Sequence, residues 1–355
     1  MRIGVDAREL CGRPTGVGRY LSGLLREWTA DASAGRHHFI LYAPDATGFE
    51  RSCEVRRIQG RPGTWWEQIR LPPAVRADGV NVFFAPGYTA PLRLPAPLVV
   101  TIHDLSFVAH PEWFGLREGV RRRWLTERAA RQARAVVTVS EFSRRELIDR
   151  LGVDAARIHV IPHGASCPPA GTAGADRAPI VLFVGSIFNR RRVPELIRAF
   201  GPIAQRHPDA SLEIVGDNRT YPHHDIGRIV SAEGLDGRVR WHQFLPDPEL
   251  RTLYGRARAF AFLSEYEGFG LTPIEALAAG VPPVLLDTAV ARETCGDAAL
   301  YVPADDIGAA TAAIERALFD VAARKQILAA APGVLARYSW PEAARRTLAV
   351  LERSA

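Results

Sequence analysis

The sequence predicts an α/β protein of two domains, each a parallel β-sheet covered by helices. Short apolar runs alternate with helical stretches from end to end, which is the pattern of parallel sheets buried on both faces. The 355 residues suffice for two cores of ordinary size. A stretch rich in small residues and proline, at 166–178, separates two series of strands and predicts an exposed linker.

The order of the predicted strands justifies the two-domain division. In the first half, strands are expected at Arg2–Ala7, His37–Ala43, Val80–Pro86, Leu98–Asp104, Ala135–Ser140 and Ile158–Gly164. In the second half, they are expected at Ile180–Ser186, Ser211–Gly216, Val239–Phe244, Ala259–Ser264, Val281–Asp287 and Ala298–Pro303. We therefore expect Rossmann-like domains at 1–165 and 179–339, with a helix at 340–355 that returns to complete the first domain.

Composition and charge limit the kinds of binding partner and the cellular compartment that can be expected. The net charge of +6 and the pI of about 9.4 favour anionic partners, but without an RNA-binding signature, zinc finger or basic tail no nucleic-acid partner is expected. The four cysteines show no paired spacing, so they predict reduced thiols rather than disulfides. The chain opens directly into a strand and carries no long apolar run, which predicts a cytoplasmic protein, either soluble or peripheral on the membrane.

The sharpest pattern follows the predicted strand Ala259–Ser264. The chain passes through two glycines and enters a helix, for which we expect Thr272 as the N-cap and Pro273 as the first helical residue. Such a loop aims backbone N–H groups and a helix dipole at one point, which suits a diphosphate. Glu267 and Glu275 can flank the phosphates and accept hydrogen bonds from sugar and ribose hydroxyls. A surface turn with solvated glutamates is the alternative.

This segment resembles the donor-binding signature of the retaining glycosyltransferases of family 4, which have the GT-B fold. In that signature two glutamates are separated by seven residues, as Glu267 and Glu275 are here. The resemblance implies two Rossmann-like domains that face each other across a cleft holding the site. It also implies that Glu267 contacts the donor sugar and Glu275 the nucleotide ribose. The loop residues expected to bind the donor, with the backbone of the last three holding the diphosphate, are Gly268, Phe269, Gly270, Leu271 and Thr272.

Three more stretches extend the resemblance over nearly the whole chain. Gly12–Tyr20 resembles the family's first glycine-rich turn, and Thr101–Phe107 with His110–Phe114 resembles the segment after its fourth strand. Ser140 is expected to cap the next helix. The resemblance implies a catalytic role for His103, although a histidine hydrogen-bonded in a crowded turn fits the local pattern equally well. From the first turn, the expected donor-binding residues are Gly16, Val17 and Gly18.

A basic cluster follows the first strand of the second domain. After Gly185, itself an expected donor-binding residue, Arg190 and Arg191 can pair with the pyrophosphate and neutralise charge on the departing nucleotide, so both are expected to bind the donor and to act in catalysis. The family usually has lysine at the position of Arg191, and arginine is not equivalent to lysine. Arg192 fits a solvated face. We expect no metal or other cofactor, because no Asp-x-Asp motif follows a strand and the arginines can supply the positive charge.

The acceptor side is less defined. Residues 115–134 hold seven arginines against two glutamates, with Leu116, Val120 and Trp124 at helical spacing. Two readings fit: this helix lies against anionic lipid or a lipid-diphosphate acceptor, or its apolar stripe packs into the core. The pair Trp65-Trp66, which precedes an expected helix at Glu67–Val75, leaves the same choice between a membrane or acceptor platform and core packing. The expected acceptor-binding residues are Tyr88, Asp104, Arg121 and Trp124.

The function implied is transfer of a hexose, with retention of configuration, from a nucleotide-sugar to a hydroxyl of an oligosaccharide or lipid-linked acceptor in bacterial surface polysaccharide assembly. Mannose from a GDP-sugar is the expected donor by resemblance, and a UDP-sugar stays open because the base-contacting loops cannot be read for guanine against uracil. A sugar-nucleotide epimerase and a non-catalytic nucleotide-binding protein are the rival hypotheses.

Overall fold

The computed structural model describes residues 1–12, 15–30, 36–165 and 177–355, and this described chain divides into two compact units. Unit 1 contains Met1–Ala109, Leu116–Gly164 and Tyr338–Ala355. Unit 2 contains His110–Gly115 and Ala165–Arg337. Each unit holds its own parallel sheet.

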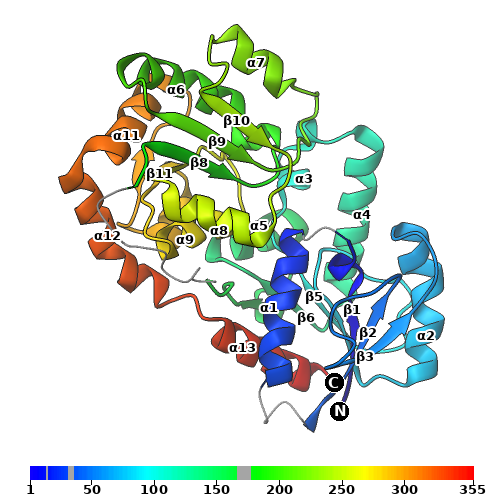
Figure 1. The fold of residues 1–355 in the computed structure, drawn as a ribbon. Helices are drawn as coiled ribbons and strands as arrows, with labels where there is room; N and C mark the ends of the chain where they lie inside the picture. The colour runs from blue at the N-terminus through cyan, green and yellow to red at the C-terminus, as the bar shows by residue number, and fades with distance from the viewer. Residues whose placement is uncertain (13–14, 31–35, 166–176) are drawn as a thin grey trace. The chain divides into compact units, whose positions relative to one another are not determined.

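The sheet of unit 1 has seven strands in the order β3-β2-β1-β4-β5-β6-β7, all parallel (Figure 1). Its central strands are buried along their whole length, as the continuous apolar runs predict. The strands are β1 (Arg2–Asp6), β2 (His38–Ala43), β3 (Glu54–Arg57), β4 (Val82–Ala85), β5 (Leu98–Thr101), β6 (Ala135–Thr138) and β7 (Ile158–Val160).

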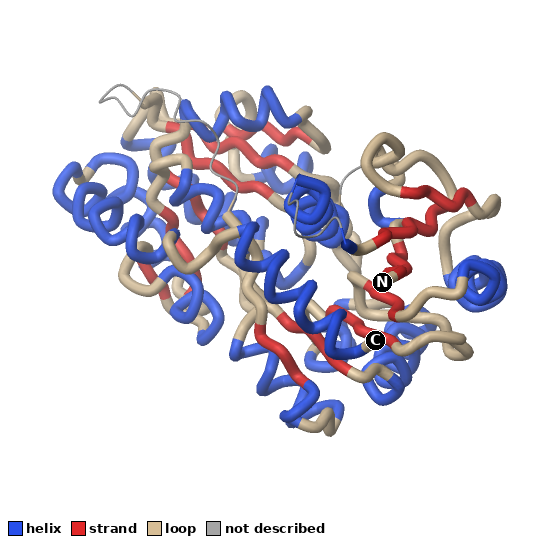
Figure 2. The backbone as a smooth tube through the Cα atoms, turned by 90° about the horizontal axis from the view of Figure 1, so that it is seen from below, coloured by secondary structure: helices blue, strands red, loops and turns tan. Residues whose placement is uncertain are grey.

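Helices cover this sheet, and the first and last helices of the chain lie side by side on it (Figures 1 and 2). Trp28 joins them, because its indole Nε1 donates to the carbonyl oxygen of Ala344 at 2.9 Å while its ring stacks on Phe39. The helices of unit 1 are α1 (Gly16–Ala30), α2 (Leu71–Asp78), α3 (Ser106–Ala109), α4 (Leu116–Gln132), α5 (Glu141–Leu151) and α13 (Trp340–Ser354), with short helical turns at Arg8–Leu10, Trp66–Arg70 and Ala155–Arg157.

The sheet of unit 2 has six parallel strands in the order β10-β9-β8-β11-β12-β13. The strands are β8 (Ile180–Val184), β9 (Ser211–Val215), β10 (Val239–His242), β11 (Ala259–Phe262), β12 (Pro283–Leu286) and β13 (Leu300–Val302). The helices are α6 (Val193–Arg206), α7 (Ile226–Ala232), α8 (Asp247–Arg256), α9 (Leu271–Ala278), α10 (Ala289–Cys295), α11 (Ile307–Phe319) and α12 (Val321–Leu335), with short turns at Pro111–Trp113 and Asn189–Arg191.

All twelve expected strands are present, and the structure adds β3, which the sequence pattern did not predict. Its residues, Glu54–Arg57, are charged except for one valine and half-exposed at the sheet edge, so no apolar run marks them. The helix expected at Glu67–Val75 is a π-helical turn at Trp66–Arg70 that continues into α2, which ends at Asp78.

The expected linker at 166–178 falls mostly on residues 166–176, which lie outside the described part of the chain. Arg177, at its end, donates to the carbonyl oxygens of Tyr254, Ala257 and Ala279 and so belongs to unit 2. No helix in the described part of the chain combines the length and the hydropathy that crossing a bilayer requires.

Candidate active site

The strand order of unit 2 reverses between β8 and β11, and ligands of such sheets bind beyond the carboxyl ends of the strands at this reversal. The loop after β8 carries Gly185 and Arg191, and the loop after β11 carries Glu267. The two loops are joined directly, because the Glu265 amide donates to the carbonyl oxygen of Arg190 at 2.8 Å. The structure therefore brings the predicted basic cluster and the first predicted glutamate together.

Glu267 is held in a fixed position by charged and polar neighbours. The Arg191 guanidinium binds it with both prongs, Nε at 2.7 Å from Oε1 and Nη2 at 3.3 Å from Oε2. The Ser264 hydroxyl donates to Oε1 at 3.0 Å, and Arg190 Nε lies 3.8 Å from the same oxygen. Because the two-pronged geometry fixes a carboxylate in orientation as well as position, Glu267 is pre-oriented at this sheet end.

The Arg191 side chain takes its place because Gly185 leaves room for it. A Cβ on Gly185 would lie 2.5 Å from Arg191 Nη1, and the residue has φ +143, a backbone conformation that side chains rarely adopt. The guanidinium packs over the ring of Phe188 at 5.6 Å and that of Phe262 at 5.1 Å. Gly185 thus supports the site by admitting Arg191.

Arg192 points to different partners from its two neighbours. It adopts a left-handed conformation, with φ 48, and pairs with Glu265 at 3.0 Å and with Asp305. The run of three arginines is therefore divided: Arg190 and Arg191 reach Glu267, whereas Arg192 joins the two loops at the edge of the site.

The helix α9 begins one turn after Glu267 and carries Glu275. Its N-cap is Gly270, in the left-handed conformation with φ 89, and the helix starts at Leu271. The expectation of Thr272 as N-cap and Pro273 as the first helical residue is wrong by two positions. Proline fits here as well, because the N–H groups of the whole first turn have no partner inside the helix. Tyr254 Oη lies 3.4 Å from Glu275 Oε2 and orients that carboxylate.

In unit 1 the strand order reverses between β1 and β4, and a second group of predicted residues lies beyond them. Gly16, Val17 and Gly18 form the first turn of α1, where the Gly18 amide donates to Thr15 Oγ1 at 2.9 Å. Val17 packs against Gly87, which follows β4. The predicted glycine-rich turn is thus a helix N-terminus, and its residues Arg13 and Pro14 lie outside the described part of the chain.

His103 follows β5 and is buried among aromatic rings. Its Nε2 lies 2.8 Å from the carbonyl oxygen of Pro86, which only accepts, so Nε2 carries the proton and Nδ1 is the basic nitrogen of the neutral ring. Burial lowers the pKa of His103, with smaller opposing effects from the Pro86 hydrogen bond and Asp104. The Ser143 hydroxyl donates to the His103 carbonyl oxygen at 3.1 Å. The structure holds both the ring and the backbone of this residue.

Asp104 and Tyr88 meet beside His103. The Tyr88 hydroxyl donates to Asp104 Oδ2 at 2.8 Å, while Oδ1 accepts from the amide and hydroxyl of Ser106. Tyr88 has φ 61, which is uncommon for a bulky residue, and its ring lies 5.6 Å from that of His103. Asp104 therefore orients both Tyr88 and the start of α3.

Two family models divide the chain between them. The model described as Glycosyltransferase Family 4 matches residues 14–167, and the model described as Glycosyl transferases group 1 matches residues 171–333. Together they span both units and contain His103, Arg191, Glu267 and Glu275. The chain belongs to the family 4 glycosyltransferases.

Known proteins agree with this placement. The glycosyltransferase is 28% identical over 280 residues to O-antigen chain mannosyltransferase B of Escherichia coli, an alignment that covers 75% of this chain and 73% of that protein. It is 27% identical over 281 residues to a GDP-mannose:cellobiosyl-diphosphopolyprenol alpha-mannosyltransferase of Xanthomonas campestris, covering 77% and 72%. Sucrose-phosphate synthase of Thermosynechococcus elongatus shares the GT-B fold, with a TM-score of 0.79 at 21% identity and coverage of 99% and 98%.

The remaining predicted acceptor residues lie elsewhere on the glycosyltransferase. Arg121 donates to Thr64 Oγ1 at 2.6 Å, and Trp124 is 47% exposed on α4. The residue of α4 that reaches Tyr88 is Arg122, whose guanidinium lies 5.4 Å from the ring centroid. The sequence did not distinguish these adjacent arginines, because helix periodicity sets which face each occupies only once the helix phase is known.

The apolar stripe of α4 is exposed, so the alternative that it packs into the core is wrong. Leu116 is 82% exposed and Val120 is 62% exposed, in line with Trp124. The residues that α4 buries are instead Gly119, Leu125, Thr126, Ala129 and Ala130. Trp66 is buried, which fits core packing, whereas Trp65 is 70% exposed, which fits a membrane or acceptor platform.

A buried charged network that sequence reasoning missed lies at the end of β1. Arg8 pairs with Glu67 and lies 3.0 Å from Asp6, and both carboxylates are almost fully buried. Burial raises the pKa of Asp6 to about 6, with Arg8 opposing the shift and Glu67 adding to it. Asp6 ends an apolar strand and Glu67 stands 61 residues later, so only the fold brings them to one arginine.

Within the described ranges, no group of three or more His, Cys, Asp or Glu side chains is arranged to hold a metal ion. Both side chains of the acidic pair Asp305-Asp306 have partners within the protein. Asp305 pairs with Arg192, and the Asp306 side chain caps α11. Sequence reasoning also missed Ser264, Tyr254 and Ser143, which contact predicted site residues. The partners of Tyr254 and Ser143 lie in other segments, and a serine three residues before a glutamate is no signal by itself.

Proposed function

We propose that this glycosyltransferase transfers mannose, or a related hexose, from a GDP-sugar to a hydroxyl of a lipid-linked or oligosaccharide acceptor, with retention of anomeric configuration, in bacterial surface polysaccharide assembly. Two similar proteins support the choice of sugar, since one is named an O-antigen chain mannosyltransferase and the other a GDP-mannose-dependent mannosyltransferase. UDP is the alternative nucleotide.

The observation that carries the proposal is the fixed Glu267 at the reversal of the unit 2 sheet. A carboxylate held by a two-pronged arginine accepts hydrogen bonds from sugar hydroxyls in one orientation. The N-terminus of α9 follows it directly and presents unpaired backbone N–H groups that suit a diphosphate. Glu275, inside that helix, accepts from the ribose, with Tyr254 holding its other side.

Arg190 and Arg191 supply the positive charge of the reaction. As the glycosidic bond breaks, the bonding electron pair leaves with the nucleoside diphosphate, and guanidinium groups at that point stabilise the developing charge. We propose that this suffices without a metal ion. Same-face attack, in which the departing phosphate oxygen takes the acceptor proton, gives retention without a protein nucleophile. Transfer that persists undiminished after chelation with EDTA is the expected result.

His103 is proposed to orient the reacting groups as a neutral ring. Its proton is committed to the Pro86 carbonyl, so Nδ1 offers a lone pair to a hydroxyl. Burial keeps the pKa of His103 below its ordinary value, which preserves the neutral form near pH 7. Ser143 restrains the backbone carbonyl of the same residue.

We also propose that α4 rests on an anionic membrane surface, where a lipid-linked acceptor would be found. Leu116, Val120 and Trp124 form an exposed apolar stripe on a helix that carries four further arginines besides Arg121 and Arg122. Such a helix inserts its apolar side chains while the arginines pair with anionic headgroups.

The function is tested by ligand-induced thermal stabilisation together with product analysis. A nucleotide that binds only the folded protein raises its stability with occupancy, so GDP is expected to raise the Tm more than UDP. Glu275→Ala is expected to reduce this shift, because it removes the ribose contact. Glu267→Ala is expected to keep most of the shift and to lower the transfer rate about 10²-fold or more. Glu249→Ala, an exposed glutamate on α8, is the matched control.

The outcomes separate the rival functions. A larger Tm shift with UDP than with GDP would identify uracil rather than guanine as the donor base and would leave the proposed reaction unchanged. Conversion of the donor sugar to its epimer without any acceptor would identify an epimerase, and nucleotide binding without turnover of any donor and acceptor pair would identify a non-catalytic protein. If neither glutamate change alters binding or transfer, the site lies elsewhere.

A further inference from the structure

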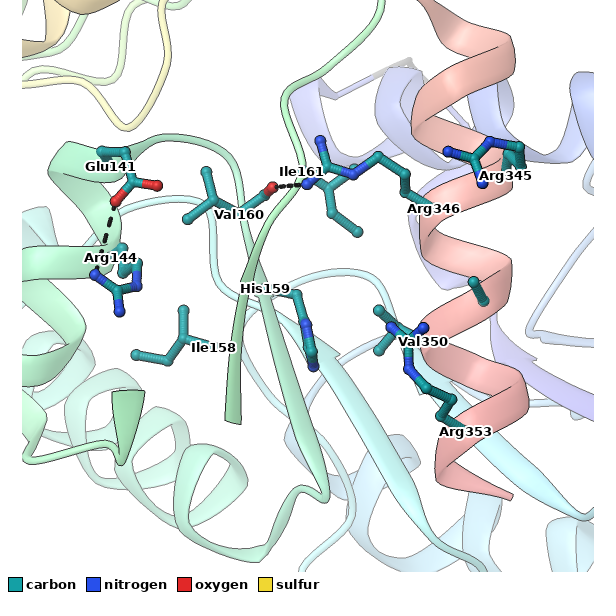
Figure 3. Close-up of a pocket in the computed structure, with 11 residues that line it drawn as sticks. Glu141, Arg144, Ile158, His159, Val160, Ile161, Arg345, Arg346, Val350 and Arg353 are labelled. Carbon is teal, nitrogen blue, oxygen red and sulfur yellow. Dashed lines mark hydrogen bonds and ion pairs between the residues drawn. The ribbon is translucent and has the colours of Figure 1, made fainter. Parts of the chain in front are cut away.

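A groove of about 580 Å³ lies in unit 1, and its lining contains none of the residues proposed above to act on the donor or acceptor. Its base is the edge strand β7, and its two walls are the start of α5 and the exposed side of α13 (Figure 3). This volume is within the range of pockets that hold small ligands.

The polar lining of the groove is almost entirely basic. Arg144 comes from α5, whereas Arg345, Arg346 and Arg353 come from α13 and His159 from β7 between them (Figure 3). Glu141 is the one acidic residue of the lining, and it lies 3.8 Å from Arg144. The lining therefore has an excess of positive charge that favours an anion.

The two arginines of α13 that lie near His159 influence its pKa. Burial lowers its pKa, and the charges of Arg353 and Arg346 lower it further. Three cationic or potentially cationic groups thus converge on one place at the base of the groove. An anion placed among them would reverse the electrostatic effect of the arginines on His159.

The shape of the groove favours a small ligand over a strand or a bilayer. The edge strand is blocked for pairing with a peptide, because Arg346 Nη2 donates to the carbonyl oxygen of Val160 at 2.6 Å. The aliphatic side chains of the base, Ile158, Ile161 and Val350, are at most 7% exposed, so they present no apolar surface on which a membrane could rest.

We propose that this groove is a second ligand site of the protein, which binds a phosphate ester or diphosphate through Arg346, Arg353 and Arg144. Planar guanidinium groups pair with phosphate oxygens in two-pronged fashion, which favours phosphate over a lone carboxylate. The site shares no residue with the proposed donor site and does not rest on the proposed transfer reaction.

The test follows the His159 ring by NMR in the full chain, with His159→Gln used to assign its signals, while pyrophosphate is added. Bound pyrophosphate is expected to raise the pKa of His159, with a dissociation constant in the micromolar to millimolar range. Arg353→Gln is expected to weaken this binding about tenfold, which corresponds to one charge-assisted hydrogen bond. Arg150→Gln is the matched control, because Arg150 is an exposed arginine of α5 that lies outside the groove lining and is paired with Glu146.

A second arm distinguishes the source of the phosphate. GDP and pyrophosphate that both move the His159 signal would identify a soluble ligand, as proposed. Movement caused only by phosphatidylglycerol vesicles would overturn the proposal in favour of a membrane contact. No change in the His159 pKa with millimolar pyrophosphate, or equal weakening by Arg353→Gln and Arg150→Gln, would also overturn it. None of these readouts requires a transfer assay, so failure here is separate from failure of the proposed function.

Discussion

Arg191 illustrates how one side chain is placed by residues far away in sequence. Its two-pronged contact with Glu267 depends on the absence of a Cβ at Gly185 and on the rings of Phe188 and Phe262. The resembled family usually has lysine at this position, and a lysine ammonium cannot form the same fork. The charge at this point is therefore shared with the family, whereas the geometry is a property of this chain.

We therefore predict that the positive charge of Arg191 contributes more to the rate of transfer than its two-pronged geometry does. Arg191→Lys keeps the positive charge beside the leaving diphosphate and is expected to hold kcat within about tenfold of the unmodified protein, whereas Arg191→Met should lower kcat about 10²- to 10³-fold. Steady-state kinetics checks both values. Arg192→Gln is the control, because Arg192 pairs with Glu265 and Asp305 instead. Equal losses for the lysine and methionine variants would show that the fork, rather than the charge, is required.

At the scale of elements, α4 has two faces with different roles. Its buried face, around Leu125 and Ala129, fixes the helix on unit 1, and Arg122 reaches the Tyr88 ring from it. Its opposite face carries the exposed stripe of Leu116, Val120 and Trp124. Because the stripe makes no contribution to the core, its substitution can be expected to change surface binding without unfolding the helix.

The proposed membrane contact predicts that Trp124→Ser weakens co-sedimentation with phosphatidylglycerol vesicles about tenfold, because a Trp side chain transfers out of water on binding. Raised salt should weaken the binding of the unmodified protein, since the arginines act through charge. Val321→Ser, a change at an exposed valine of α12, is the control. Unaltered sedimentation of the Trp124 variant, with an unchanged Tm, would contradict the contact.

For the whole molecule, the buried network at Asp6 links stability to pH. The folded-state pKa of Asp6 is raised by burial from 3.8 to about 6, so the folded protein holds this proton more tightly than the unfolded chain. Its contribution to stability is therefore fully present below the unfolded pKa and is lost as the pH rises through about 6. Arg8 opposes the shift in the Asp6 pKa and so limits this loss, whereas Glu67 adds to it.

Replacing the acid by its neutral amide is expected to remove this pH dependence. Between about pH 4 and about pH 7, the free energy of unfolding of Asp6→Asn should rise relative to the unmodified protein by up to about 3 kcal/mol. Urea unfolding of the two proteins at both pH values measures the difference, in which the other titrating groups cancel. Parallel behaviour of the two proteins across this range would show that folding does not shift the pKa of Asp6.

Much of the fold and part of the site could be predicted from the sequence because their signals are local. Apolar runs marked every buried strand, and the glycines between Glu267 and Glu275 predicted the loop that joins strand β11 to helix α9. Edge strand β3 escaped prediction, because its charged residues pair only along one side. The N-cap of α9 was misplaced by two residues, because a proline fits several positions of a first turn.

The sequence by itself determined the α/β class, the two series of strands, the excess of positive charge and the residues of the candidate donor loop. Only the tertiary structure decided which of three consecutive arginines reach Glu267, which nitrogen of His103 carries the proton, that the α4 stripe faces solvent, and that Arg8 joins two buried carboxylates. The physical reason is the distance along the sequence over which each kind of interaction acts. Periodicity and turn chemistry act between near neighbours, whereas burial, ion pairing and hydrogen-bond partners depend on segments that meet only when the strands have taken their order in the sheet.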